Sequence, residues 1–198
     1  MKLKFEKTIK GEATGFAEKI LAGLYIYAKG PQEKKEIKEW HNNMVRAQQI
    51  QPFMNSVADR FRRFPPKYHS LRSQKSPIKV GDEIEFLLMK TKSTAVEFCP
   101  ARRVIAIQYV KLSKPVEAGG AYSVALSNDK EYWLPLNNNF VLEELARNDG
   151  FASMEALLDY FLPLDSKQNE LSLKLVHWTQ FRYPINPLER AASVGAEQ

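Results

Sequence analysis

The sequence predicts a mixed α+β fold in which about six strands form a small barrel, with helices in the connections between them. Three observations support this prediction. Segments in which polar and apolar residues alternate, typical of strands, occur near both ends of the chain and in its middle. Amphipathic segments with three- and four-residue spacing, typical of helices, lie between them. Breaks such as Gly30-Pro31 and Pro65-Pro66 separate these segments.

The first third of the chain predicts one strand and three helices. Residues 2–9 alternate and form the first strand, and residues 16–23 form a short amphipathic helix that ends at Gly23. Residues 32–64 form two charged helices divided near Pro52. Both helices have apolar residues at helical spacing, so each has one face that packs inward.

The basic stretch at residues 67–82, KYHSLRSQKSPIKVGD, organises the centre of the chain. It ends in a turn at Gly81, where glycine supplies a backbone geometry that other residues strain to adopt. Strands predicted at residues 67–72 and 83–90 flank this turn, forming a β–β corner with a basic rim. Its cationic side chains are Lys67, Arg72, Lys75 and Lys79.

The rest of the chain continues the alternation of strands and helices. The predicted strands are residues 95–99, 101–112, 121–127, 132–134 and 171–182. The predicted helices are residues 139–147 and 154–161, with Gly150 closing the first and Ser153 capping the second. Residues 184–198 are small and polar, and we expect this tail to be loosely ordered after a single domain at residues 1–183.

Length and composition fit one globular domain. The chain has 198 residues, 44% hydrophobic and 26% charged, enough to bury a core without a disulfide or a metal ion. One cysteine, Cys99, and three histidines predict neither a disulfide nor a zinc site, and we expect no cofactor. The net charge of +6 permits an anionic partner such as nucleic acid. The sequence lacks a signal-peptide core and an apolar run of about 20 residues, so we expect a cytoplasmic protein without membrane contact.

Five pieces of the sequence resemble the ASCH-domain family of the PUA-like superfamily. They are FAEKILAG at 16–23, KYHSLR at 67–72, KVGD at 79–82, LARNDGFASMEALLDYF at 145–161 and LVHWTQFRY at 175–183. Family members have, in the same order, a helix ending in glycine, a K-x-h-T-I-R strand, a W-K-x-G-D turn, an A-x-x-D/E-G-F helix pair and a closing strand. The resemblance implies a PUA-like pseudobarrel with flanking helices, in which residues 25–66 form a helical insertion.

The resemblance also implies a function and a set of catalytic candidates. The family's cleft is associated with RNA or nucleotide-like ligands, and a small bacterial relative is an amidohydrolase that removes the acyl group from N4-acetylcytidine. That enzyme uses a Lys and a Thr of the K-x-h-T strand and a later Glu. By motif, Lys67 matches the Lys, Ser70 matches the Thr and Asp149 falls near the Glu. Serine keeps the hydroxyl, and aspartate keeps the carboxylate on a shorter arm.

The chemistry of these three residue types fits the implied roles. A desolvated Lys67 beside Arg72 loses its proton readily and can take a proton from Ser70, making that hydroxyl a nucleophile. Asp149 can serve as the acid that protonates a leaving amine. Lys67 and Ser70 are three residues apart and point to opposite faces of a regular strand, so their convergence requires a bend.

Three functions remain open. The first is binding of RNA or a modified nucleoside in a basic cleft, and the second is hydrolysis of an acylated nucleoside. The third is interaction with a protein partner through the helices of residues 32–64. Trp178 either stacks on a base or fills the core, and Arg72 either clamps an oxyanion or forms an ion pair at a strand end. The candidate nucleic-acid-binding residues are Lys67, His69, Arg72, Lys75, Lys79, Trp178 and Arg182.

Overall fold

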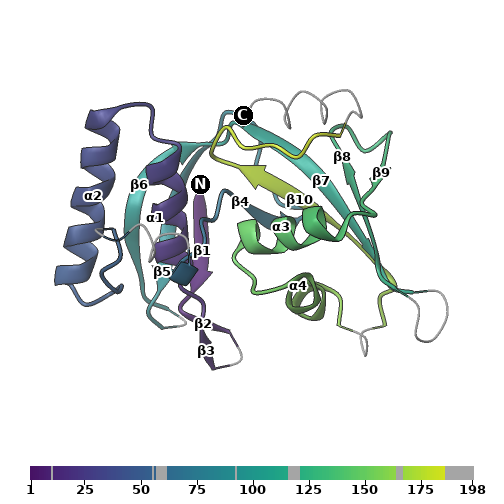
Figure 1. Cartoon of the computed structure of the whole chain (residues 1–198), viewed down its shortest axis with the longest axis horizontal. Helices are drawn as coiled ribbons and strands as arrows, with labels where there is room; N and C mark the ends of the chain where they lie inside the picture. The colour runs from purple at the N-terminus through teal and green to yellow at the C-terminus, as the bar shows by residue number, and fades with distance from the viewer. Residues whose placement is uncertain are drawn as a thin grey trace.

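The computed structural model describes residues 1–9, 11–54, 56, 62–91, 93–115, 121–163 and 167–185. These residues form four α-helices and two main sheets, of three and five strands, which lie side by side (Figure 1). The predicted mixed α+β class is therefore confirmed. The two sheets do not close into a barrel within the described residues.

The three-stranded sheet has the order β1-β5-β6, with β1 parallel to β5 and β5 antiparallel to β6. Its strands are β1 (Lys2–Glu6), β5 (Glu83–Met89) and β6 (Ala95–Arg103). Leu3 and Phe5 of β1 are buried and their neighbours exposed, as the alternation predicted. The predicted strand at residues 2–9 ends early, and the chain continues into a small hairpin of β2 (Thr8–Ile9) and β3 (Glu12–Ala13).

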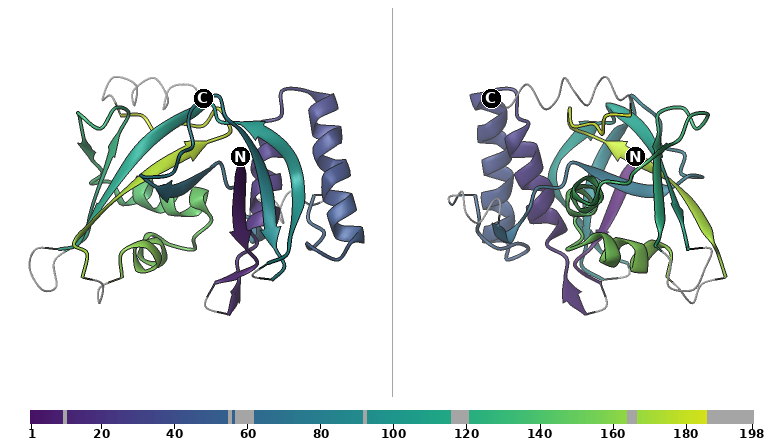
Figure 2. Two further views of the ribbon diagram at one scale, coloured as in Figure 1. Left: turned by 180° about the vertical axis from the view of Figure 1, so that it is seen from behind. Right: turned by 45° about the vertical axis from the view of Figure 1, so that its right-hand side comes forward.

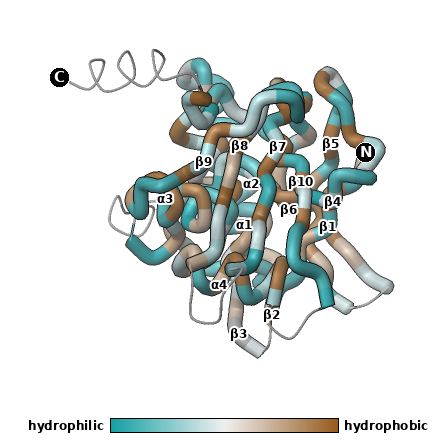
Figure 3. Tube along the Cα trace, turned by 90° about the vertical axis from the view of Figure 1, so that its right-hand side faces the viewer, coloured by the Kyte–Doolittle hydropathy of each residue, from teal (hydrophilic) through white to brown (hydrophobic). Residues whose placement is uncertain are grey.

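The five-stranded sheet is antiparallel, in the order β4-β10-β7-β8-β9. Its strands are β4 (His69–Ser73), β7 (Ala106–Ser113), β8 (Ser123–Ser127), β9 (Leu134–Pro135) and β10 (Glu170–His177). Hydropathy changes from residue to residue along this sheet (Figure 3), as expected of strands with one face in the core. The chain passes from β6 to β7 at Ile105, whose N–H donates to the His177 carbonyl at 2.8 Å.

Two pairs of helices flank the sheets (Figures 1 and 2). The pair beside the three-stranded sheet is α1 (Phe16–Ile26) and α2 (Pro31–Arg46), and the pair beside the five-stranded sheet is α3 (Asn139–Asp149) and α4 (Met154–Phe161). The caps predicted around α3 and α4 are confirmed. Gly150 follows α3 in the left-handed conformation, with φ of 98°, and the Ser153 side chain accepts a hydrogen bond from the Ala156 N–H.

The prediction that Gly23 ends the first helix is wrong, because α1 continues to Ile26. Gly23 instead lies where α1 meets the backbone of the segment before β4. A Cβ atom at this position would lie 2.5 Å from the carbonyl oxygen of Lys67. The glycine therefore allows a close approach between two backbones and does not serve as a helix stop.

The segment predicted as an insertion contributes to the main core. Ile37, Met44, Phe53 and Phe64 are all buried in the cluster that also holds β1, β5 and β6 side chains. Half of the second helix predicted in this segment falls on residue 55 and residues 57–61, outside the described residues. The outward face of α2 is charged, as at Lys35 and Glu39.

Of the predicted tail, residues 186–198 lie outside the described residues. Within the described parts of the chain, none of the helices combines the length and the apolar composition that crossing a membrane requires.

Candidate functional site

A hollow of about 60 Å³ opens between the free edges of the two sheets. One wall is β1, with Phe5, and the other is β4, with Ser70 and Arg72. Lys67 and Asp149 also line it, so the structure brings together all three residues predicted as catalytic. We call this space the central hollow. It exists because β1 and β4 are edge strands that do not pair with each other.

The Lys67 and Asp149 side chains form a buried ion pair at the back of the central hollow. The Lys67 ammonium donates to Asp149 Oδ1 at 2.5 Å and also to the Asp149 backbone carbonyl. Only 1% of the lysine side chain and 4% of the aspartate side chain are exposed. Oδ1 also accepts from the Leu71 N–H at 3.0 Å. One carboxylate therefore ties the end of α3 to the segment that enters β4.

The position of Lys67 is set by α1 and by two glycines. The Lys67 N–H donates to the Lys19 carbonyl at 2.9 Å, and Gly23 leaves room for the Lys67 backbone. Gly150 leaves room for the Phe16 ring, since a Cβ atom there would lie 2.6 Å from it. That ring in turn lies 5.2 Å from the Lys67 ammonium, in a cation–π arrangement.

Burial and the mutual attraction of the two charges shift the pKa of each side chain in opposite directions. Desolvation by burial lowers the pKa of Lys67 to about 8, although the charge of Asp149 raises it. Burial also raises the pKa of Asp149, but Lys67 and His69 outweigh this effect and the pKa lies below its usual value. Asp149 is thus a carboxylate at neutral pH, which does not suit the predicted role of an acid for the leaving amine.

Ser70 faces the central hollow from the second residue of β4. The predicted conflict between Ser70 and Lys67 does not arise, because β4 begins at His69 and Lys67 precedes the strand. Strand alternation therefore does not force their side chains apart. Ser70 is only 3% exposed but lines the central hollow, so a ligand would reach its hydroxyl from that space.

Arg72 has a buried donor that is left without a partner in the described part of the chain. Its guanidinium lies 5.0 Å from the Phe5 ring centre, and its Nη2 donates to the Lys4 carbonyl at 3.5 Å. Its Nε is buried and has no hydrogen-bond partner among the described residues. The alternative of an ion pair at the strand end is not seen there. An unpaired guanidinium N–H beside a hollow suits an oxygen acceptor from a ligand.

His69 lies behind the ion pair and not on its solvent side. The ring is fully buried, with Nδ1 3.4 Å from Asp149 Oδ1 and Nε2 3.1 Å from the Tyr183 hydroxyl. Burial lowers the pKa of His69, so the ring is neutral at pH 7. Nδ1 has no hydrogen-bond partner among the described residues, so its approach to Asp149 Oδ1 is an electrostatic contact, and Nε2 pairs with the Tyr183 hydroxyl. His69 thus supports Asp149 and does not meet a ligand directly.

Four of the predicted binding residues lie away from the central hollow or inside the core. Lys75 and Lys79 are exposed in the connection between β4 and β5 and do not line the hollow. Arg182 donates to the carbonyls of Thr179 and Phe181 in its own loop. Trp178 is buried and packs edge to face against Phe86, so of the two alternatives for this residue the structure supports the core position and not stacking on a base. Its ring fills the core beneath the three-stranded sheet instead.

Sequence reasoning missed the aromatic rim of the site. Phe16, Phe151 and Tyr160 line both the central hollow and an adjoining space of about 340 Å³, which we call the outer hollow. Tyr160 is 47% exposed although it stands in an amphipathic helix. These rings have helical spacing or follow a cap, which is the pattern of core residues. The signal available in the sequence was Tyr160, an aromatic residue that lies outside the apolar stripe of the predicted helix at 154–161.

No group of three His, Cys, Asp or Glu side chains in the described part of the chain is placed to bind a metal ion. Comparison with protein-family models, with curated proteins and with solved structures found no match to this chain. The function must therefore be argued from the site.

Proposed function

We propose that the two connected hollows bind a nucleobase, either in RNA or in a modified nucleoside. The observation that carries the proposal is Arg72, whose side chain lines a hollow with an aromatic rim and whose buried Nε has no hydrogen-bond partner among the described residues. The motifs that resemble ASCH domains support the same function. The PUA-like pseudobarrel belongs to this proposal, with the seam between β1 and β4 as its ligand-binding opening.

The sizes of the two hollows suggest how such a ligand would lie. A water molecule takes up about 30 Å³ of liquid, so the central hollow of about 60 Å³ has room for only a small group. The outer hollow, at about 340 Å³, falls in the range of ligand pockets and has room for a ring. We place an exocyclic amide or carbonyl beside Arg72 and the base between Phe16 and Tyr160.

Replacing Arg72 by glutamine should weaken binding of N4-acetylcytidine about tenfold or more. The reason is that a hydrogen bond from a charged donor contributes about 1.5–3 kcal/mol, and glutamine leaves the ligand oxygen without it. Titration calorimetry with the nucleoside, and fluorescence anisotropy with a short single-stranded RNA, would measure the change. Arg103→Gln, at an exposed position at the end of β6, is the matched control and should bind as the wild type does. Equal affinities for the two variants would refute the role of Arg72.

A second candidate, amide hydrolysis on an acylated nucleoside, is favoured by the convergence of Lys67, Ser70 and Asp149 on the central hollow. Neutral Lys67 would take the Ser70 proton while the hydroxyl oxygen bonds to the acyl carbon. The Lys67 ammonium would then protonate the departing amine nitrogen as the C–N bond breaks. Water would release the acyl group as a carboxylic acid and restore the serine. Asp149 positions Lys67 in this scheme, and Lys67 serves as both base and acid.

If the protein hydrolyses N4-acetylcytidine, kcat/KM should rise with pH and level off near pH 8. The sign follows from Lys67, since burial lowers its pKa to about 8 and only the neutral amine accepts a proton. Below that pKa the neutral fraction falls about tenfold per pH unit. Loss of the substrate's ultraviolet absorbance would measure the rate. Ser70→Thr should keep activity and Ser70→Ala should lose it. A flat profile between pH 6 and 9, or an active Ser70→Ala variant, would exclude the scheme.

A further inference from the structure

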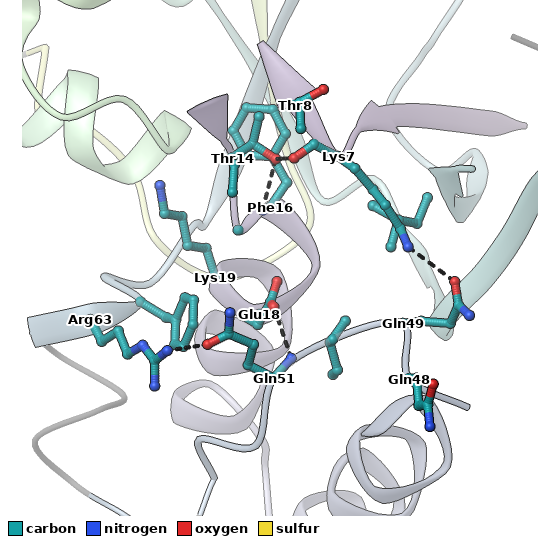
Figure 4. A pocket seen from close by; sticks show the side chains of 15 residues that line it. Lys7, Thr8, Thr14, Phe16, Glu18, Lys19, Gln48, Gln49, Gln51 and Arg63 are labelled. Carbon is teal, nitrogen blue, oxygen red and sulfur yellow. Dashed lines mark hydrogen bonds between the residues drawn. The ribbon is translucent and has the colours of Figure 1, made fainter. Parts of the chain in front are cut away.

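A third hollow, of about 430 Å³ (Figure 4), shares lining residues with the outer hollow. Its walls come from the junction of β1 and β2, the start of α1, the segment that follows α2 and the residues around Arg63. We call it the Arg63 pocket. Its volume falls in the range of ligand-binding pockets. Much of one wall belongs to the segment predicted as an insertion, so that segment shapes a cavity as well as the core.

The Arg63 pocket has an excess of positive charge. Lys7, Lys19 and Arg63 line it, against the single carboxylate of Glu18. The Glu18 Oε1 atom accepts from the Gln51 N–H at 3.1 Å, and its one negative charge against three cations leaves two positive charges in excess. The N-terminal end of α1, at Phe16, also lines the pocket, and the positive end of a helix favours a negatively charged group.

Neutral groups hold these cations in place. The Lys7 ammonium donates to Gln49 Oε1 at 3.1 Å, and the Arg63 guanidinium donates to the Gln51 side-chain oxygen (Figure 4). The Lys19 ammonium donates to the Gly150 carbonyl at 2.7 Å. Amide and carbonyl oxygens orient a cation without cancelling its charge. The pocket therefore keeps its attraction for an anion.

The Arg63 pocket adjoins the proposed nucleobase site. It shares Thr14, Phe16 and Lys19 with the outer hollow, and the outer hollow shares Phe16 and Tyr160 with the central hollow. The three spaces thus follow one another from Arg72 to Arg63. A free nucleoside would fill only the first two.

We propose that the Arg63 pocket is a subsite for the phosphate and sugar of the neighbouring nucleotide, so that the ligand is single-stranded RNA and not a free nucleoside. This inference rests on the proposed function, because it needs a base in the outer hollow. Phosphate oxygens would meet Lys7 and Arg63, and the apolar wall at Phe64 would face the next sugar or base.

The test compares N4-acetylcytidine with a short single-stranded RNA that contains it, using the full chain and the double variant Lys7→Gln/Arg63→Gln. The wild type should bind the RNA more tightly than the nucleoside, and the double variant should lose most of that difference. For single strands each cation that contacts phosphate contributes about 0.7 to the slope of log K against log salt concentration, so the slope should flatten by about 1.4. Lys35→Gln/Arg103→Gln, which removes two exposed cations elsewhere, should keep the full slope.

The outcomes separate this inference from the function on which it rests. One outcome is that the nucleoside binds and Arg72→Gln weakens its binding, but the RNA binds no more tightly than the nucleoside. In that case the subsite proposal is wrong and the nucleobase site stands. An unchanged salt slope in the double variant would also overturn the subsite. If neither the nucleoside nor the RNA binds, both proposals fail. Circular dichroism of the double variant would confirm that it folds, and a single Arg63→Gln change at an exposed side chain gives a second measurement with little risk to the fold.

Discussion

The Asp149→Ala variant should be less stable than the wild type by about 3–5 kcal/mol, because removing one partner of a buried ion pair leaves the other charge unpaired. The Lys67 side chain is 1% exposed, so bulk water cannot take the place of the lost carboxylate around its ammonium group. The same change removes the acceptor of the Leu71 N–H, which lies at the seam between the sheets. Urea unfolding followed by tryptophan fluorescence would measure the loss as a lower midpoint.

A double variant shows whether the loss comes from the pair. Lys67→Met/Asp149→Leu replaces both charges with apolar groups. Its loss of stability should be smaller, by at least about 2 kcal/mol, than the sum of the losses of the single variants Lys67→Met and Asp149→Leu. Glu155→Gln, at an exposed position in α4, removes a carboxylate at the surface and should shift stability by no more than about 0.5 kcal/mol. Additive losses in the double variant would show that the two side chains do not interact as described.

The Gly23→Ala variant should be destabilised by about 2–3 kcal/mol, since the new methyl group would lie 2.5 Å from the Lys67 carbonyl oxygen. A backbone atom cannot move aside as a flexible side chain can. Helix propensity alone predicts the opposite sign, because alanine in a helix interior is favoured over glycine by about 1 kcal/mol. The sign of the change in unfolding free energy therefore decides between the two accounts.

The same variant should also impair the site. Separating α1 from Lys67 would lengthen the hydrogen bond from the Lys67 N–H to the Lys19 carbonyl and displace the ammonium from Asp149. Ligand affinity, measured as for Arg72→Gln, should fall. Glu36→Ala, at an exposed position in α2, is the control for a change to alanine within a helix and should leave both stability and binding nearly unchanged. A Gly23→Ala protein more stable than the wild type would contradict the close approach.

Local patterns were enough to predict much of the fold. The helix at 154–161 and its Ser153 cap agree with the structure, because capping and amphipathic spacing depend on residues within one turn of each other. The strand at 83–90 was predicted within one residue. Predictions failed where one residue had two explanations. Gly23 fits a helix end as well as a close contact, and only a partner more than 40 residues away decides between them.

The candidate site was also predicted only in part. Motif order brought Lys67, Ser70, Arg72 and Asp149 to attention, and all four line the central hollow. The aromatic rim was not predicted, because its residues have the spacing of core positions. The ASCH resemblance itself stays a prediction that the binding experiments can test.

Residue type and spacing alone established the α+β class, the caps of α3 and α4 and the presence of a basic stretch with a serine and, farther along, an aspartate. Those properties depend on neighbours in the chain. Tertiary packing decided that β1 and β4 remain unpaired edges, that α1 and α3 meet the segment before β4 and that Trp178 lies in the core. These results depend on contacts between residues far apart in sequence, whose geometry local periodicity does not encode.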